Sequence, residues 1–161
     1  MAAPRWTITN GVPFALSATP KTLLALIAAA DVRPLISELS VSIDSTQIVY
    51  VELCESTGAT AGTPGTSTAA SVFKQIGNFT KIDSTTPTVT GGGNYSAEPT
   101  VLTRIKHWYF TGPGPFVLQS PMGREPESLG SAATKYRALM LRVSVLTGTP
   151  NGIGYLEFEQ G

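Results

Sequence analysis

The sequence predicts an all-β protein, a jelly-roll-like antiparallel β-sandwich of about eight to ten short strands. Apolar residues alternate with polar ones in short runs, and clusters of Thr, Ser, Gly and Pro separate these runs. Alternation places one face of a strand in a core and the other in water. No stretch indicates a helix longer than two turns. The long connections between some runs favour a jelly roll over a simple meander.

Each strand is predicted from the pattern of its own side chains. Residues 39–44 (LSVSID) and 49–55 (VYVELCE) alternate clearly, and 101–110 is the longest aromatic run. Residues 139–145 (LMLRVSV) alternate in the same way, and 155–159 (YLEFE) place a tyrosine and two glutamates on one face. The predicted strands are residues 5–9, 14–18, 22–29, 35–44, 47–55, 71–81, 101–110, 116–119, 136–146 and 154–159.

Three connections are expected to join strands that pair with each other. Residues 30–34 suit an antiparallel connection, 44–46 form a tight turn, and 148–152 form a hinge. Each would make its flanking strands neighbours in one sheet. Two longer stretches, 56–70 and 83–96, consist mostly of small and polar residues. We expect both to be surface loops.

The chain is expected to form one domain with an N-terminal arm. A length of 161 residues suits a single domain with one core. Residues 1–13 form the expected arm, and residues 14–161 form the sandwich. The apolar run 23–30 is similar to the hydrophobic part of a signal peptide, but it begins more than twenty residues into the chain. It is also too short to span a bilayer, so we expect a buried strand or short helix and no membrane partner.

The composition predicts a weakly charged, neutral surface. Eleven basic and eleven acidic side chains cancel, and charged residues make up 14% of the chain, against about 25% in ordinary soluble domains. A protein without net charge is poorly protected from self-association. The basic residues are scattered from Arg5 to Arg142 without a dense cluster. This argues against a nucleic-acid partner.

The chemistry-bearing side chains do not form a catalytic pattern. His107 is the only histidine and Cys54 the only cysteine, so neither a zinc site nor an intrachain disulfide is expected. No nucleophile elbow accompanies His107, and Cys54 is expected to be a small buried side chain. Residues 91–93 (GGG) lack the lysine and helix of a phosphate loop. We expect a protein that is not an enzyme and that uses no cofactor or metal.

Two segments supply the candidate partner contacts. Trp6 is a large apolar group near a chain end, where it can anchor the arm on a neighbour or pack on its own domain. If it anchors the arm, deleting residues 1–9 should weaken partner binding more than folding. Residues 121–127 (PMGREPE) form a stiff loop, which is either a pre-organised contact or a simple connection with an internal ion pair. The candidate interface residues are Arg5, Trp6, Met122, Arg124 and Glu125.

Five stretches spread over most of the chain carry a resemblance: residues 21–26 (KTLLAL), 39–44 (LSVSID), 51–58 (VELCESTG), 97–100 (AEPT) and 121–126 (PMGREP). In this order they resemble small virion proteins of tailed bacteriophages, and in particular the jelly-roll decoration, or cement, proteins of phage heads. The resemblance implies a structural protein without catalytic residues. It implies a homotrimer that binds the major capsid protein on the outer surface of the expanded capsid, in the virion, after synthesis in the host cytoplasm.

Three other functions stay open. A carbohydrate-binding sandwich of a phage head or tail fibre would contact sugar through Trp108, Tyr109, Glu125 or Glu127. Another possibility is a capsid or tail subunit that is obligatory for assembly. Stable particles that lack the protein would argue against this function. A hydrolase would depend on His107.

Overall fold

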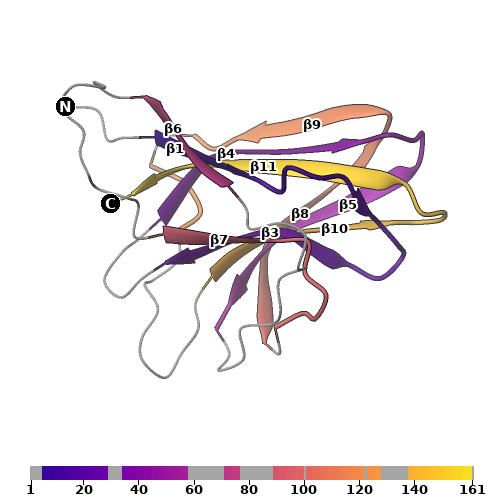
Figure 1. The fold of residues 1–161 in the computed structure, drawn as a ribbon, viewed down its shortest axis with the longest axis horizontal. Coiled ribbons are helices and arrows are strands. Elements are labelled where there is room, and N and C mark those ends of the chain that lie inside the picture. Colours follow the sequence, from indigo (N-terminus) through magenta and orange to yellow (C-terminus); the bar gives the residue numbers. More distant parts are fainter. Residues whose placement is uncertain are drawn as a thin grey trace.

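The structure, a computed structural model, describes residues 5–28, 34–57, 71–76, 89–99, 101–121, 123–127 and 138–160. All regular structure in these residues is β, and two antiparallel sheets pack against each other (Figure 1). The predicted β-sandwich is confirmed. Within the described ranges, no helix has the length and hydrophobicity that a membrane crossing requires.

Eleven strands form the two sheets in the described residues. The first sheet has the order β6 (Ser71–Ile76), β1 (Arg5–Thr9), β11 (Asn151–Gln160), β4 (Pro34–Ile43) and β9 (Gly114–Gln119), and the short β2 (Phe14–Ala15) also pairs with β11. The second sheet has the order β7 (Val89–Gly93), β3 (Lys21–Ala28), β10 (Ala138–Val145), β5 (Ile48–Ser56) and β8 (Leu102–Thr111).

The pairing of eight of these strands is that of a jelly roll. With β2, β6 and β7 set aside, the first strand pairs with the eighth (β1 with β11) and the second with the seventh (β3 with β10). The third pairs with the sixth (β4 with β9) and the fourth with the fifth (β5 with β8), all antiparallel. Such nested pairs are the two Greek keys of a jelly roll, divided between two sheets.

The three expected pairs of consecutive strands are wrong. The connections from β3 to β4, from β4 to β5 and from β10 to β11 each cross from one sheet to the other. The last two connections meet at one end of the sandwich, where the backbone N–H of Asn151 donates to Asp44 Oδ1 at 2.8 Å. A tight turn reverses the chain, but it does not decide whether the returning strand pairs beside its predecessor or packs in front of it.

The structure also places part of one expected loop and part of the expected arm in strands. Residues 89–93, expected in a loop, form β7, because glycines that lack a side-chain pattern still supply backbone groups for pairing with β3. Residues 5–9, expected in an arm, form β1 in the interior of the first sheet, between β6 and β11. The other expected loop, 56–70, lies outside the described residues from position 58 onward, as do residues 1–4.

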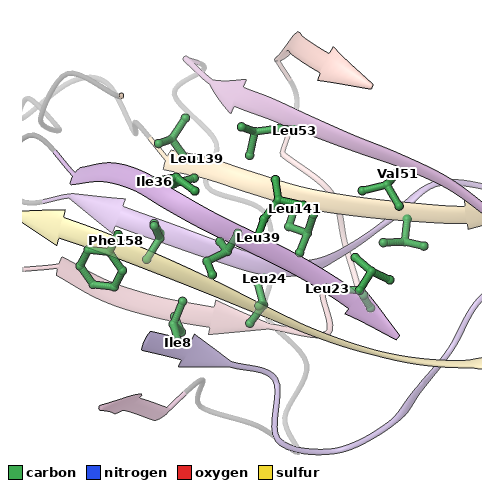
Figure 2. Packing of buried hydrophobic residues seen from close by; sticks show 14 of the residues in the cluster. Ile8, Leu23, Leu24, Ile36, Leu39, Val51, Leu53, Leu139, Leu141 and Phe158 are labelled. Atoms are coloured by element: carbon green, nitrogen blue, oxygen red, sulfur yellow. The ribbon is translucent and has the colours of Figure 1, made fainter. Parts of the chain in front are cut away.

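The main core lies between the two sheets (Figure 2). Ile8, Leu39 and Phe158 reach it from the first sheet, and Leu24 and Leu141 reach it from the second. These side chains are almost completely buried. The alternation in the sequence therefore predicts correctly which residues point inward.

A second apolar cluster lies on the outer face of the second sheet. Ala25, Cys54 and Met140 belong to it, whereas Leu24, Leu53 and Leu141 beside them in the chain belong to the main core. The ring of Tyr95, which is 1% exposed, packs against this cluster. The segment that carries Tyr95 is fixed to β3, because the backbone N–H of Tyr95 donates to the carbonyl oxygen of Thr22 at 3.0 Å. The second sheet is thus buried on both faces in this region.

Candidate functional site

The two residues with the greatest catalytic potential lie in different settings. Cys54 is buried, and burial, with Glu52 beside it, raises the pKa of its thiol to about 11. The thiol therefore stays protonated near neutral pH. His107 is exposed on β8, with its ring centroid 5.7 Å from that of Tyr50. In the ranges that the structure describes, no three metal-ligating side chains gather.

A chain of ion pairs crosses the outer face of the second sheet. Arg142 on β10 contacts Glu98 (Nε to Oε2, 3.2 Å) and Glu52 on β5 (Nη1 to Oε1, 2.5 Å). Glu52 also accepts a hydrogen bond from Nε of Arg104 on β8 at 3.0 Å. The Glu52 side chain is only 3% exposed, so its charge depends on these two guanidinium groups. Glu98 in turn accepts from the backbone N–H and the hydroxyl of Thr22, which fixes residues 94–99 to the sheet.

Aromatic rings lie next to this chain of ion pairs. Tyr50 and Tyr109 are direct cross-strand neighbours on β5 and β8, with ring centroids 4.9 Å apart. The guanidinium carbon of Arg104 lies 5.6 Å from the centre of the Tyr50 ring. The two tyrosines open onto a surface hollow with a volume of about 440 Å³. Its lining residues are Ala18, Ile48, Tyr50, Tyr109, Ser144, Val145 and Leu146.

The edge strands β8 and β9 form one long side of the sandwich. They are the terminal strands of the two sheets, and the turn at Gly112 joins them. Only glycine fits there, because a Cβ atom would collide with the carbonyl oxygen of Ser45. Along this side the core is partly open to solvent. We call it the β8/β9 side; it comprises exposed Val101, Ile105 and Val117 and half-buried Trp108, Phe110 and Phe116.

The outer face of the first sheet is mostly polar, although register and alternation also place exposed Val117 and Ile153 on it. Arg5 on β1 pairs with Glu159 (2.9 Å) and Glu157 (3.4 Å) on β11. The hydroxyl of Tyr155 donates to Glu38, which also accepts from the side-chain amide of Gln119 at 2.8 Å. Burial and the hydrogen bond with Glu38 raise the pKa of Tyr155 to about 12. The charged groups of this face thus have partners within the sheet.

The N-terminal candidate residues separate onto opposite faces of β1. The Arg5 side chain is 40% exposed and lies on the polar outer face. Trp6 is 8% exposed and belongs to the main core. Of the two alternatives for Trp6, the structure shows packing on its own domain, because alternation along β1 directs the indole inward.

The candidate loop adjoins the start of β4. Arg124 is exposed, and its backbone N–H donates to the carbonyl oxygen of Pro121 at 2.9 Å, which closes a turn. Glu125 is half-buried, and Met122 lies outside the described residues. Glu127 forms an isolated β-bridge with Leu35. Leu35 lies opposite Glu159 on β11, and Glu159 in turn lies opposite Arg5 on β1. The structure therefore brings Arg5 and the loop to the same end of the first sheet.

The four candidate sugar contacts do not come together. Trp108 packs against the main core, whereas Tyr109 lines the hollow. Glu125 and Glu127 follow β9 near the start of β4, and the hollow lies beyond the opposite end of that strand, where β5 begins. The sequence signal for the hollow was weak, because Tyr50 and Tyr109 become neighbours only through the pairing of β5 with β8.

Comparisons with protein-family models, with curated proteins and with solved structures each find no match to this chain. Its function is therefore inferred from its fold and from the surfaces described above.

Proposed function

We propose that this protein is a non-enzymatic structural protein of a phage virion. In this proposal it binds the outer surface of the expanded capsid and bridges neighbouring copies of the major capsid protein. The observation that carries the proposal is the β8/β9 side of the jelly roll. Exposed apolar side chains that gather on one side of a polar molecule indicate a contact with another protein.

The β8/β9 side has the composition of an interface. Val101, Ile105 and Val117 are 47%, 39% and 48% exposed, and half-buried aromatic rings on the same two strands pack against the main core. Trp108 and Phe110 both contact Phe116, with ring centroids 6.0 Å and 5.3 Å apart. Large aromatic groups held by their own core contribute much of the binding energy in protein interfaces, because little side-chain entropy is lost on binding.

The edge position of these strands also selects the kind of partner. Backbone groups on the outer edge of a terminal strand can pair with an extended segment of another protein. Arg104 and Lys106 on β8 disfavour pairing between two copies of β8, because like charges would face each other. An acidic or neutral strand of a different protein, such as a capsid subunit, fits this edge better.

A homotrimer would explain how weak contacts, each made by one β8/β9 side, stabilise a capsid. Three copies would present three β8/β9 sides, and the second and third contacts would form at a high effective concentration. Binding only to the expanded shell would stabilise that shell by mass action. The zero net charge of the chain supports self-association. A C3 ring would require a head-to-tail contact between subunits.

The test compares two isoleucines with equal exposure. Ile105 on β8 and Ile153 on β11 are both 39% exposed, but they lie on different sides of the molecule. We expect Ile105→Lys to weaken co-sedimentation with expanded heads that lack the protein by about tenfold or more, which corresponds to about 1.4 kcal/mol. Ile153→Lys should leave it unchanged.

The mass of the free protein, measured by light scattering, completes the test. A trimer that co-sediments with the heads supports the proposal, and a monomer that ignores them contradicts it. Heads that form and stay intact without the protein would show decoration, whereas heads that fail to form would show an obligatory subunit.

A further inference from the structure

We propose that the hollow on the outer face of the second sheet binds a pyranose ring of a saccharide, with Tyr109 as the stacking platform. The hollow lies on a face of β8 that differs from the β8/β9 side. The inference therefore adds a glycan contact to capsid attachment and does not depend on it.

The walls of the hollow are aromatic and aliphatic. Tyr109 is 69% exposed, and the Tyr50 ring meets it at an interplanar angle of 40°. Ile48 and Leu146, which are 46% and 69% exposed, face them from the start of β5 and the end of β10. The volume of about 440 Å³ falls within the range of about 300–1,000 Å³ of small-molecule sites.

The shallowness of the hollow selects the ligand. A wholly apolar ligand would keep much of its apolar surface in water, because Ile48, Tyr109 and Leu146 in the walls are themselves more than one-third exposed. A pyranose ring has one face of C–H groups and a rim of hydroxyl groups, so it can bury the first and leave the second in water. The electron-rich face of a tyrosine ring attracts such C–H groups.

Polar groups beside the rings can reach the hydroxyl rim. The guanidinium of Arg104 lies against the Tyr50 ring, and its side chain is 53% exposed. Its Nε is fixed by Glu52, which is buried and is itself held by Arg142. This arrangement positions the Arg104 head before any ligand arrives, which lowers the entropy cost of binding. Ser144 and exposed His107 add further hydrogen-bonding groups nearby.

Ordinary cross-strand packing explains why Tyr50 and Tyr109 touch. It does not explain why three exposed side chains, Ile48, Tyr109 and Leu146, surround a hollow beside Tyr50 and stay open to water. A docking site for a protein side chain would use the same apolar area, but it would not need an aromatic ring face. The two possibilities therefore predict different results when Tyr109 is replaced by an aliphatic residue.

The experiment titrates the full chain with maltotetraose, cellotetraose and chitotetraose, each to about 10 mM, and follows binding by NMR chemical shifts. We expect at least one of them to bind with a millimolar dissociation constant and to shift the signals of Tyr109 and Tyr50. Tyr109→Phe keeps the ring and should retain binding. Tyr109→Leu keeps apolar area without a ring face and should weaken binding by about tenfold or more.

Two further variants make the result decisive. Leu146→Ser removes another wall and should also weaken binding, whereas Ile153→Ser on the first sheet should not. All three positions are exposed, so the four variants should unfold at the wild-type temperature. The proposal is overturned if none of the three saccharides shifts these signals, or if Tyr109→Leu binds as well as wild type. The second result would identify an apolar docking site instead.

Discussion

At the scale of the residue, buried polar groups connect the parts of the sandwich. Asn10 is fully buried, and its side-chain amide donates to Oδ1 of Asn94 at 3.0 Å while its Oδ1 accepts from the backbone N–H of Gly154 at 3.0 Å. Asn94 has a φ of +49°, a conformation that asparagine tolerates better than most residues. The end of β1 is thereby tied both to β11 and to the segment that follows β7.

Glu52 gives the clearest prediction at this scale. Glu52→Gln removes one of the two carboxylates that compensate Arg142, whose side chain is only 14% exposed, and the carboxylate that pairs with Arg104. We expect a loss of about 3 kcal/mol in the free energy of unfolding, because breaking a buried pair leaves uncompensated charge. Urea denaturation of the variant and of the wild type measures this loss.

The control for Glu52 is Glu159→Gln. It breaks the pair with Arg5, in which the two side chains are 40% and 29% exposed. This change should cost less than about 1 kcal/mol. Equal losses for the two variants would contradict the importance of burial for the Glu52 pair.

At the scale of the element, β1 is the strand whose role differs most from its expected role. It pairs with β11 and β6 on its two sides, in registers that place Trp6 opposite Phe158 and Ile8 opposite Leu156. Both inward side chains belong to the main core. A strand in this position is needed for folding, whether or not it also contacts a partner.

Deleting residues 1–9 should therefore prevent stable folding, not merely weaken partner binding. Replacing a buried Trp or Ile by Ala typically costs about 2–5 kcal/mol, and the whole domain is stabilised by about 5–15 kcal/mol. The deletion also leaves the interior edge of β11 unpaired. Thermal unfolding followed by circular dichroism measures the effect.

The matched variants are Trp6→Ala and Arg5→Ala. The first should lower the melting temperature strongly, whereas the second, on the polar outer face, should change it little. A deletion variant that melts at the wild-type temperature would restore the interpretation of residues 1–9 as an arm.

At the scale of the whole molecule, two groups of the sandwich titrate at high pH, the buried Cys54 and the half-buried Tyr155. The folded protein raises the pKa of Cys54 from 9.0 to about 11 and that of Tyr155 from 10.0 to about 12. Both folded-state values lie above the unfolded ones, so the folded state binds these protons more tightly. The associated stability is complete below pH 9 and is lost as the pH rises through the folded values.

We expect the urea midpoint to fall between pH 8.5 and pH 11. Raising the pKa of Cys54 from 9.0 to about 11 contributes at most about 2.7 kcal/mol to the free energy of unfolding. Cys54→Ala should remove this contribution and flatten the profile between pH 9 and pH 11. A variant with the wild-type pH profile would show that the buried thiol does not contribute.

The class of the fold and the inward-facing residues of its clearest strands can be predicted from the sequence. Side chains at every second position of residues 39–44, 49–55 and 139–145 encode which face of each strand meets the core. These properties are local, because they depend on the chain's own period and on the hydrophobic effect. Cys54 lies on the opposite face of β5, and its burial depends on the second apolar cluster, which contains Tyr95.

Only the tertiary structure decided which strands are neighbours. Strands pair through backbone N–H and C=O groups, which are the same in nearly every residue, so the sequence pattern does not name the partner. The crossing of consecutive strands between sheets, the interior place of β1 and the pairing of β5 with β8 all belong to this level. For this reason the meeting of Glu52 with two arginines, and of Tyr50 with Tyr109, could be found only in the folded chain.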